Sequence, residues 1–564
     1  MNRWAGLALF VLMAALFLVA NRGAYKGYFQ DDELDNISWA PQVPLSEFGK
    51  TLITPRYLHQ NFRPVGHFYF HEAGKHFGLD FPRYVFFIHL LHFLNVWLVW
   101  LLARRLGASP FAASTGALFF AFHMAAFDVY WKPMYVFDLL CGSFCLASLI
   151  LYLGGRWVLS FLAFWLAYKS KELAVMLPAV LACYEFWLGQ KRWKPLVPFF
   201  AAALSFGLQG LLLNPNRDND YTFRFTPRAL ATTVPFYAGK IFLIPYGGLA
   251  LPLVPLVLRE RRVWLCLAAT LLFFVPLAFL PGRMFSAYCY VPLIGVALLL
   301  AVATDRAPRM AMAAFFVLWI PWNYAHLRLY RRQALAIADQ NRRYVTALEA
   351  LARSEPAVRT FVYDGRPDAL NVWGIHGALQ YLYRRFDLRL VNIEDPGAEA
   401  ALQENAVAVL SWDPLKSRLS TIARRPGAPD ASFIRMDSST PLWQLEQGWY
   451  PLEAGYRWTQ PVATARLFRP AEANEFELTV NIGPDVIRDL GRIGVHVLVN
   501  GQLLGSHEFT RNGWQTVRWP LPPGKAGTAQ VEMRVEPGYR PSNRDPRALG
   551  LAVGSFGFST KETM

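Results

Sequence analysis

Cysteine is scarce in this chain of 564 residues, and all five cysteines lie within the first 289 positions. They are Cys141, Cys145, Cys183, Cys266 and Cys289, each within or beside an apolar run. The long polar part that follows therefore contains no disulfide, even if it faces an oxidising compartment. Cys141 and Cys145 are four residues apart, but no neighbouring His or Cys completes a metal site, so we expect packing residues.

Charged residues are also few, at 17% of the chain, and the 40 acidic residues are outnumbered by 56 Lys and Arg. The sequence has no internal repeat and no low-complexity tract. With 54% hydrophobic residues, the chain is more apolar than a soluble protein of this length, which predicts a multi-span membrane protein. The net charge of +16 lies in short groups between apolar runs, which argues against a nucleic-acid partner.

Eleven apolar segments are expected to cross the membrane. We interpret the first as a retained span, because no convincing signal-peptide cleavage site follows it. Several segments are shorter than the ~20 residues that a perpendicular span needs, so tilt or extension into loops is expected. The segments are residues 5–20, 86–103, 110–126, 134–153, 157–168, 173–188, 195–213, 231–258, 263–280, 286–303 and 309–322.

Basic residues mark alternate loops, and by the positive-inside rule these loops face the cytoplasm. They are Arg104, Arg105, Arg156, Lys191, Arg192, Lys194, Arg259, Arg261, Arg262, Arg306 and Arg309. The opposite face then receives residues 21–85, a polar loop, and residues 127–133, 169–172, 214–230, 281–285 and everything after 322. We therefore expect a multi-pass plasma-membrane protein whose C-terminal part is periplasmic or extracellular.

The sequence predicts three domains, because the pattern of apolar and polar residues changes after the last span and again near residue 446. Residues 1–322 form the membrane domain, and residues 323–445 form a helical segment with a small α/β unit. The α/β unit has expected strands at 360–363, 388–391 and 406–410 and a helix at 373–385. Residues 446–564 alternate as in a β-sandwich, with a hairpin signal at Asn500-Gly501. Its aromatic residues, Trp449, Tyr456, Trp458 and Trp514, either pack in the core or bind carbohydrate.

Four carboxylates lie together in the first exterior segment, at the mouth of a membrane span: Asp31, Asp32, Glu33 and Asp35. Holding acidic groups near hydrocarbon costs free energy, so such a cluster indicates a use. One interpretation is a catalytic site that contains a general base. The other is a solvated loop, or a carboxylate that caps a turn or a helix.

Several short segments occur in an order that resembles one enzyme superfamily. They are Arg63-Pro64-Val65-Gly66-His67, Leu90-Leu91-His92-Phe93-Leu94-Asn95 followed by Arg104-Arg105-Leu106-Gly107, Ala121-Phe122-His123-Met124 followed by Asp128-Val129-Tyr130-Trp131, Ser170-Lys171-Glu172, and Arg283 to Pro292. Together they resemble the GT-C glycosyltransferases, the polyprenyl-phosphate-sugar enzymes related to protein O-mannosyltransferases. The chain departs from that pattern at Met124, where relatives have Pro, and at Asp128, where many have Glu. No tetratricopeptide repeats follow, so a eukaryotic-type protein acceptor is not implied.

The resemblance implies a bacterial inner-membrane enzyme with a GT-C-like helical domain. Such an enzyme moves a hexosyl group, mannosyl in the named relatives, from a polyprenyl-phosphate donor to a hydroxyl of a glycan, lipid or protein acceptor. Direct displacement requires a carboxylate that takes the acceptor proton. Asp32 or Asp31 is the candidate base, and we favour Asp32 because Asp32-Glu33 also matches the "DE" of the first loop in mannosyltransferase relatives. Glu33 and Asp35 are expected to be solvated or structural.

Asp128 is a third acidic candidate on the same membrane face, four residues before Lys132. It either orients the acceptor or a divalent cation, or forms a salt bridge with Lys132. Oxygen ligands would suit Mg²⁺ or Mn²⁺, although the sequence requires no metal. Three histidines, His89, His92 and His123, have no acidic partner at metal-ligand spacing, so we expect core hydrogen bonds.

Cations must meet the anionic phosphate of the leaving group at the membrane surface. The candidates are Arg283, Arg63, Lys171 and Lys169, with Arg283 preferred because an aromatic run follows it. Glu172 is expected to hold Lys171 in place. The alternative for each cation is contact with lipid headgroups.

Two other classes of function stay open. A transporter or flippase of lipid-linked glycans would place charges at mid-membrane depth and carry interrupted helices in related pairs. A non-catalytic assembly subunit would bind glycans through its C-terminal domain without transfer. The transferase is favoured because the strongest acidic signal lies at the surface and no inverted repeat is visible.

Overall fold

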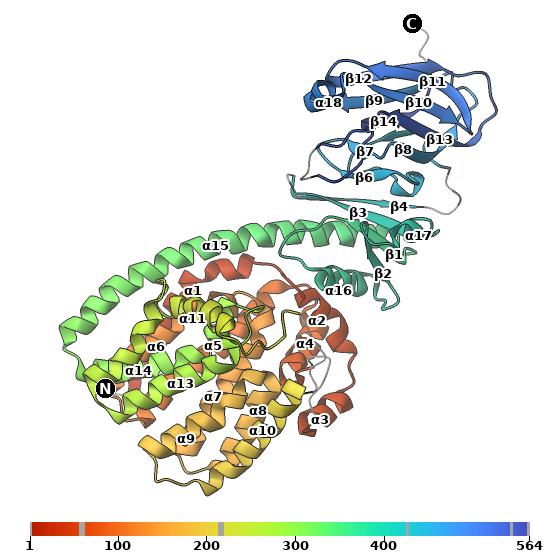
Figure 1. The fold of residues 1–564 in the computed structure, drawn as a ribbon. Coiled ribbons are helices and arrows are strands. Elements are labelled where there is room, and N and C mark those ends of the chain that lie inside the picture. Colours follow the sequence, from red (N-terminus) through yellow and green to blue (C-terminus); the bar gives the residue numbers. More distant parts are fainter. Residues whose placement is uncertain are drawn as a thin grey trace. The chain divides into compact units, whose positions relative to one another are not determined.

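A computed structural model describes residues 3–55, 62–212, 219–414, 416–424, 427, 429–541 and 545–560. The chain divides into two compact units, Met1–Asp339 and Gln340–Met564. The first unit is helical and the second is rich in strands (Figure 1). The predicted fold class is confirmed in this respect: an apolar helical region precedes a small α/β unit and a β-sandwich.

Apolar helices make up most of the first unit. Four described helices are long and apolar enough to cross a membrane, or six spans if each of two bent helix pairs counts as one. The total of eleven spans therefore stays a prediction. The helices are α1 (Arg3–Ala20), α5 (Phe81–Arg105), α6 (Pro110–Ala121), α7 (Val136–Leu153), α8 (Trp157–Ser170), α9 (Leu177–Trp187), α10 (Val197–Leu212), α11 (Pro227–Phe242), α12 (Val254–Leu258), α13 (Arg261–Ala278), α14 (Pro292–Arg306) and α15 (Arg309–Ser354).

Two predicted spans are broken, which corrects the expectation of continuous helices there. Helix α6 gives way to a 3-10 helix, η3 (Met124–Tyr130), with a bend of 66°. In the segment 231–258, helix α11 ends at Phe242 and the next helical stretch is bent by 85°. Leu243 and Tyr246 adopt left-handed backbone there, and the intervening Pro245 cannot donate a helical hydrogen bond. These breaks could not be predicted from hydropathy, because the sequence is apolar on both sides of each bend.

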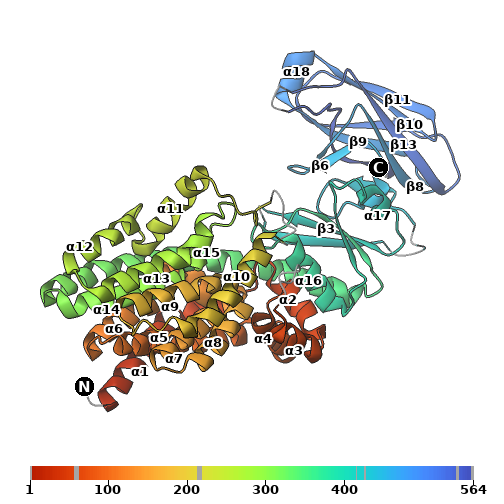
Figure 2. The same ribbon diagram turned by 60° about the horizontal axis from the view of Figure 1, so that its bottom comes forward.

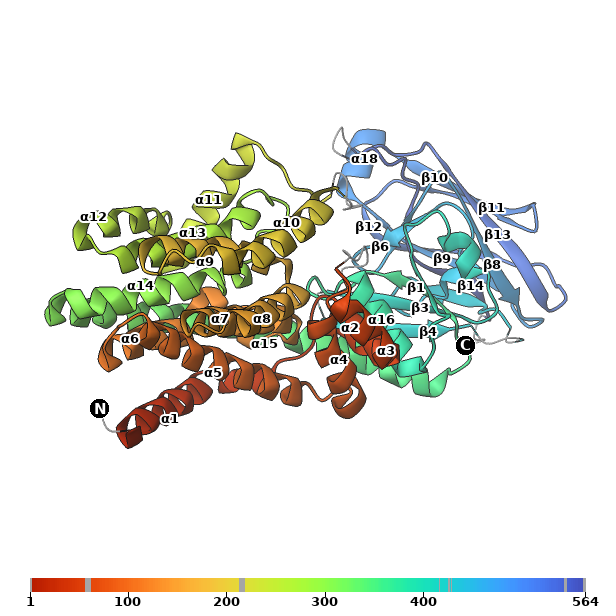
Figure 3. The same ribbon diagram turned by 90° about the horizontal axis from the view of Figure 1, so that it is seen from below.

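The segment 21–85, predicted to be an exterior polar loop, contains the α-helices α2 (Glu33–Trp39), α3 (Leu45–Ile53) and α4 (Pro64–Phe77). Helix α4 approaches α7 closely, because a Cβ on Gly66 would lie 2.0 Å from the ring of Phe137. Helix α1 packs beside α5, with the Phe17 ring centroid 5.3 Å from that of Phe93 (Figure 3). The acidic segment is thus attached to the helical core.

Three of the basic loops contact one another at one end of the helices. Arg262 donates to the carbonyl oxygen of Leu106 (3.3 Å), and Arg306 pairs with Glu260 (3.3 Å). The membrane face on which these loops lie stays a prediction. Helix α15 continues through Pro321 for 46 residues, so the expected last span and the expected helix after it are one element. Neighbouring helices allow proline inside membrane helices.

The second unit contains three sheets around one continuous core (Figure 2). In the first sheet, of order β2-β1-β3-β4, strand β1 is parallel to β2 and β3 while β4 is antiparallel. Its elements are β1 (Thr360–Asp364), α16 (Val372–Tyr383), β2 (Arg389–Asn392), α17 (Ala398–Leu402), β3 (Val407–Asp413) and β4 (Arg418–Ala423). These agree with the α/β segment predicted from the sequence.

The remaining sheets have the orders β11-β10-β13-β8 and β12-β9-β14-β7-β6, with β5 paired to β14. Alternating residues such as Phe476, Leu478 and Val480 point to the core, which is why these segments form half-buried strands. The predicted hairpin at Asn500-Gly501 joins β10 and β11. The elements are β5 (Phe433–Arg435), β6 (Trp449–Leu452), β7 (Arg457–Thr459), β8 (Val462–Arg469), β9 (Glu475–Ile482), α18 (Pro484–Leu490), β10 (Ile493–Val499), β11 (Gln502–Phe509), β12 (Gly513–Pro520), β13 (Gly527–Glu536) and β14 (Ala552–Ser559).

Candidate active site

Glu33 fixes the acidic segment to the helical core. Its buried carboxyl group accepts hydrogen bonds from the backbone N–H groups of Gln30 (2.7 Å) and Met134 (2.8 Å). Burial raises the pKa of Glu33 to about 8, so this group keeps its proton near neutral pH. Asp35 accepts from the indole of Trp39 (3.1 Å). Both residues are structural, in agreement with the sequence interpretation.

Asp32 stands at the N-cap position of α2 but makes no side-chain capping hydrogen bond. Among the described residues its carboxylate makes no ion pair and no hydrogen bond to another side chain. Burial raises the pKa of Asp32, the Asp31 charge adds to the rise, and Arg283 and Arg63 act in the opposite direction. Apart from a hydrogen bond with its own backbone, the Asp32 carboxylate is therefore without a partner among the described residues, and it lies within electrostatic reach of two of the predicted phosphate-binding cations.

Asp31 and Asp128 share one cation, Lys132. Its Nζ lies 4.0 Å from Asp31 and 3.6 Å from Asp128, so the predicted salt bridge between Asp128 and Lys132 is present. Burial opposes the charge on Lys132, but Asp128 and Asp31 outweigh it and raise the pKa of Lys132. Asp31 adopts a left-handed backbone (φ 50°), which aspartate and asparagine tolerate better than most residues.

The predicted divalent cation does not fit this acidic cluster well. Lys132 already supplies positive charge between Asp31 and Asp128. Across the described ranges there is no group of three or more His, Cys, Asp or Glu side chains placed to hold a metal ion. Mg²⁺ or Mn²⁺ bound through Asp128 stays a hypothesis that no step below uses.

Arg63 and Glu172 form a bidentate ion pair across 109 residues of sequence, with Nε–Oε1 at 2.8 Å and Nη2–Oε2 at 3.0 Å. Burial raises the pKa of Glu172, but Arg63 outweighs it and the net shift is downward. Lys171 instead pairs with both carboxylate oxygens of Asp138 at 2.6 Å. The expectation that Glu172 holds Lys171 in place is therefore wrong in its detail: Glu172 orients Arg63, and Asp138 orients Lys171.

Arg283 is the predicted cation with the most freedom to meet an anion. Its guanidinium lies over the rings of Tyr221 (4.1 Å) and Phe285 (5.0 Å) and reaches the hydroxyl of Tyr288 at 3.4 Å. No carboxylate forms an ion pair with it in the part of the chain that the structure describes. Lys171 lies over the other aromatic neighbour, with Nζ 4.1 Å from the centroid of Tyr288.

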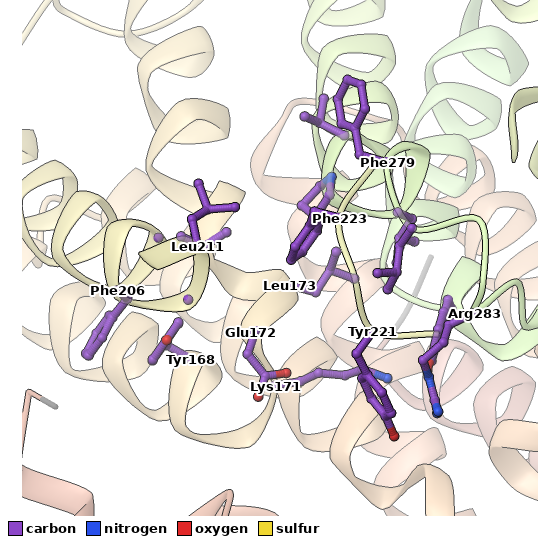
Figure 4. Close-up of a pocket in the computed structure, with 18 of the residues that line it drawn as sticks. Tyr168, Lys171, Glu172, Leu173, Phe206, Leu211, Tyr221, Phe223, Phe279 and Arg283 are labelled. Atoms are coloured by element: carbon purple, nitrogen blue, oxygen red, sulfur yellow. The ribbon is translucent and has the colours of Figure 1, made fainter. Parts of the chain in front are cut away.

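These cations line one end of a cavity of about 330 Å³, shown in Figure 4. Arg283, Lys171 and Tyr221 lie at one end, while Phe206 and Tyr168 lie at the other. Helices α10 and α13 supply apolar walls. The cavity is lined by Arg63, Tyr168, Lys171, Glu172, Leu173, Val175, Phe206, Gly207, Gly210, Leu211, Tyr221, Phe223, Phe225, Val275, Pro276, Leu277, Phe279, Leu280, Arg283 and Tyr288. Its volume is within the range of small-molecule sites.

Lys169 does not join this cluster. Its Nζ donates to the carbonyl oxygen of Thr54 (2.7 Å) and lies near the rings of Trp165 and Phe206. The side chain is buried and does not line the cavity. Of the four predicted cations, the structure thus brings Arg63, Lys171 and Arg283 together and leaves Lys169 outside.

A second, more polar cavity of about 260 Å³ includes Asp128 and Lys132 in its wall. Lys240, Ser286, Tyr330 and Gln333 also line it, together with Gln30, Met124, Ala125, Phe127, Ala334 and Ile337. Asp128 therefore lines the polar cavity, while the charges of Arg283 and Arg63, which line the apolar cavity, lower the pKa of Asp32.

The three histidines make hydrogen bonds in the core, which confirms their expected use. His89 Nε2 bonds to the carbonyl oxygen of Tyr130 (2.9 Å), His92 Nε2 to that of Ala121 (3.1 Å), and His123 Nε2 to that of Ile241 (2.7 Å).

Asp138 is the main site residue that the sequence interpretation missed. It is buried in the first turn of α7, inside a predicted span. A single acid within an apolar run is itself a functional signal, because an unpaired charge there is costly. Tyr221 was missed as well, and no sequence pattern marks it.

No protein-family model and no curated protein matches the chain. Among solved structures, ArnT from Cupriavidus metallidurans bound to undecaprenyl phosphate is similar over 74% of this chain and 98% of that chain, at 15% identity and TM-score 0.45. The arabinofuranosyltransferase AftD from Mycobacteria is similar over 99% of this chain and 58% of that chain, at 13% identity and TM-score 0.43. The oligosaccharyltransferase of Archaeoglobus fulgidus, tethered with an acceptor peptide, is similar over 99% of this chain and 97% of that chain, at 11% identity and TM-score 0.48.

At such identities and TM-scores, no residue role is transferred from these solved structures to this chain.

Proposed function

We propose that the protein is an integral membrane glycosyltransferase. It moves a sugar from a polyprenyl-phosphate donor to an acceptor hydroxyl at the outer face of a bacterial inner membrane. The proposal depends on one observation: a cavity with apolar walls and three cations at one end lies within electrostatic reach of Asp32, a carboxylate that pairs with no other described side chain. The motif resemblance favours a hexose, mannose first, and leaves glycan, lipid and protein acceptors open.

The donor phosphate binds at the cationic end of the cavity. Arg283 is free of carboxylate partners among the described residues, so it can give both of its fork donors to phosphate oxygens. Lys171 adds a point charge, held by Asp138, and Arg63 contributes charge while Glu172 fixes its direction. The polyprenyl chain follows the apolar walls past Phe206 on α10 and the residues of α13.

Asp32 acts as the general base. It takes the proton of the acceptor hydroxyl while that oxygen attacks the anomeric carbon from the face opposite the phosphate. The bond between the anomeric carbon and the phosphate oxygen breaks, its electron pair leaves with polyprenyl phosphate, and the configuration inverts. Arg283 and Lys171 stabilise the charge that grows on the leaving phosphate.

The acceptor approaches from the polar cavity beside Asp128. Lys132 offsets one of the two negative charges of Asp31 and Asp128, which weakens the repulsion between them while both carboxylates stay available to accept hydrogen bonds from acceptor hydroxyls. Asp31 raises the pKa of Asp32, which makes Asp32 a stronger base when it is ionised.

The test supplies purified protein in lipid nanodiscs with a panel of radiolabelled polyprenyl-phosphate sugars. Release of lipid phosphate is compared between wild type and Asp32→Asn. We expect turnover to fall at least ~100-fold in the variant, because general-base catalysis contributes roughly 10²–10⁴-fold. Donor binding should be retained.

Asp80→Asn provides the matched control, because it makes the same change in the same exterior segment at a partly exposed ion pair with Arg83. Its activity should equal wild type. Full activity in Asp32→Asn would overturn the base assignment. Movement of intact lipid-linked sugar across the bilayer without release of lipid phosphate would replace the transferase by a flippase.

A further inference from the structure

A third cavity lies wholly within the second unit, beside the carboxyl end of strand β2. It has a volume of about 260 Å³. Strand β1 ends at Asp364, and Ile393 and Glu394 of the wall follow directly after β2. From β2 the chain crosses through α17 to β3, and Ala398, Glu399 and Leu402 of α17 form part of the cavity wall. The crevice outside the carboxyl ends of the strands is where open α/β sheets commonly bind ligands.

Arg457 of β7 lies in the wall of this cavity and is only 3% exposed. Its guanidinium donates to the Asp364 carboxylate (3.1 Å) and to the carbonyl oxygen of Tyr450 (3.2 Å). Its Nε is buried without a partner in the described structure. A buried donor that stays unpaired costs roughly 1–3 kcal/mol, so a small movement of Arg457 that brings this Nε to a ligand oxygen would be favourable.

An aromatic side chain completes one wall. The Trp449 ring stacks on Phe556, with centroids 5.4 Å apart and planes at 13°, and its indole N–H donates to the carbonyl oxygen of Thr464 (2.7 Å). The ring is thus held rigidly with one face covered, and it remains only partly buried at the cavity wall. A flat apolar face beside a hydrogen-bonding guanidinium suits a ligand with an apolar ring face and polar edges.

Carboxylates surround the same cavity. Glu394 and Glu399 are exposed and have no ion-pair partner within the described ranges, and Glu446 lies 4.0 Å from Arg466. The Arg457 charge is matched by Asp364, which leaves the wall with an excess of negative charge. Anionic ligands are therefore disfavoured, while hydroxyl and amino groups find acceptors.

We propose that this cavity binds a short uncharged or amino-bearing saccharide, at a site separate from the one that performs transfer. The ring face of the sugar packs on Trp449, Arg457 donates to its oxygens, and Glu399 and Glu394 accept from its hydroxyl or amino groups. The volume is slightly below the ~300 Å³ lower range of small-molecule sites, so the ligand is a short saccharide or the end of a longer glycan.

The experiment uses the full-length protein in nanodiscs and measures binding by saturation-transfer NMR and calorimetry. The probes are the disaccharide of N-acetylglucosamine, glucosamine, glucuronic acid and a lysine-rich peptide. We expect the neutral and amino sugars to bind in the millimolar range or tighter, with glucuronic acid and the peptide much weaker. The Asp32→Asn variant should bind the sugars as wild type does, because the transfer site is elsewhere.

Three variants test the residues. Arg457→Lys keeps the positive charge but loses the paired N–H donors of the guanidinium. The affinity for both sugars should fall about tenfold, the equivalent of one charge-assisted hydrogen bond. Because Arg457 is buried and its replacement can disturb folding, Glu399→Gln serves as a second variant at an exposed position. In this variant the affinity for glucosamine should fall about threefold or more, and the affinity for the neutral disaccharide should be unchanged. Glu472→Gln, an exposed residue that does not line the cavity, is the control.

The proposal is overturned if neither sugar binds, if glucuronic acid or the peptide binds best, or if Glu399→Gln and a folded Arg457→Lys both bind like wild type. Loss of binding in Glu472→Gln to the same degree would also overturn it.

Discussion

Replacing Arg283 by glutamine should weaken the donor interaction and change the pH dependence of transfer together. Arg283 is the cavity cation without a carboxylate partner among the residues described, so its donors are available to phosphate. A hydrogen bond to a charged group contributes about 1.5–3 kcal/mol, and 1.4 kcal/mol is tenfold. The guanidinium is partly exposed, so we expect kcat/KM for the donor to fall about 10- to 100-fold.

The pH effect follows from the coupling of Arg283 to Asp32. Arg283 lowers the pKa of Asp32, so its removal should move the acid limb of the kcat/KM profile to higher pH. The assay is release of lipid phosphate in nanodiscs at several donor fractions, from pH 5 to 9 in roughly half-unit steps. Arg283→Lys keeps the charge and should leave the acid limb nearly in place while losing bidentate contact.

Arg228→Gln is the matched control, since Arg228 is exposed at the start of α11 and outside the cavity. An unchanged kcat/KM in Arg283→Gln would refute the phosphate role. An equal loss in Arg228→Gln would show a general effect of surface charge instead.

Three further outcomes are expected. Asp31→Asn should move the acid limb to lower pH, because Asp31 raises the pKa of Asp32, and asparagine keeps the left-handed backbone at this position; a limb that stays in place contradicts the coupling. Asp138→Asn should lower the free energy of unfolding by about 3–5 kcal/mol, because Lys171 loses a buried partner, and thermal unfolding in detergent measures it. Glu33→Gln should remove a pH dependence of stability: the folded pKa of about 8 exceeds the ordinary 4.5, so the Glu33 contribution is present at acidic pH and is lost as pH rises between these values. Parallel stability curves for wild type and Glu33→Gln would contradict the last expectation.

Much of the fold was predictable because its signals are local. Apolar runs gave the helices of the first unit, and alternating residues with Asn500-Gly501 gave the strands and a hairpin of the second. The breaks after Ala121 and Phe242 were not predicted, since apolar composition looks the same on both sides of a bend. For the break after Phe242, the proline and glycine residues from Pro245 onward were the available signal.

Part of the proximity in the candidate site could be expected from the sequence, namely that Arg63, Lys171 and Arg283 line one cavity, whereas the pairing of acids with cations could not. The acidic segment and Arg283 come from different loops, and the alternation of charge along the sequence predicts that both loops lie on one membrane face. Which acid holds which cation depends on contacts across the fold, such as Arg63 with Glu172. The burial of Lys169 is likewise invisible, because neighbouring helix positions of similar composition point in different directions.

The apolar walls of the donor cavity belong to α10 and α13, both of which are long and apolar enough to lie in lipid. A lipid whose head is held at Arg283 can therefore keep its tail in the bilayer, which avoids an extraction cost of about 0.8 kcal/mol per methylene group. The reaction then takes place in two dimensions. Its rate should follow the mole fraction of donor among the lipids, and diluting the whole suspension with buffer should leave that rate unchanged.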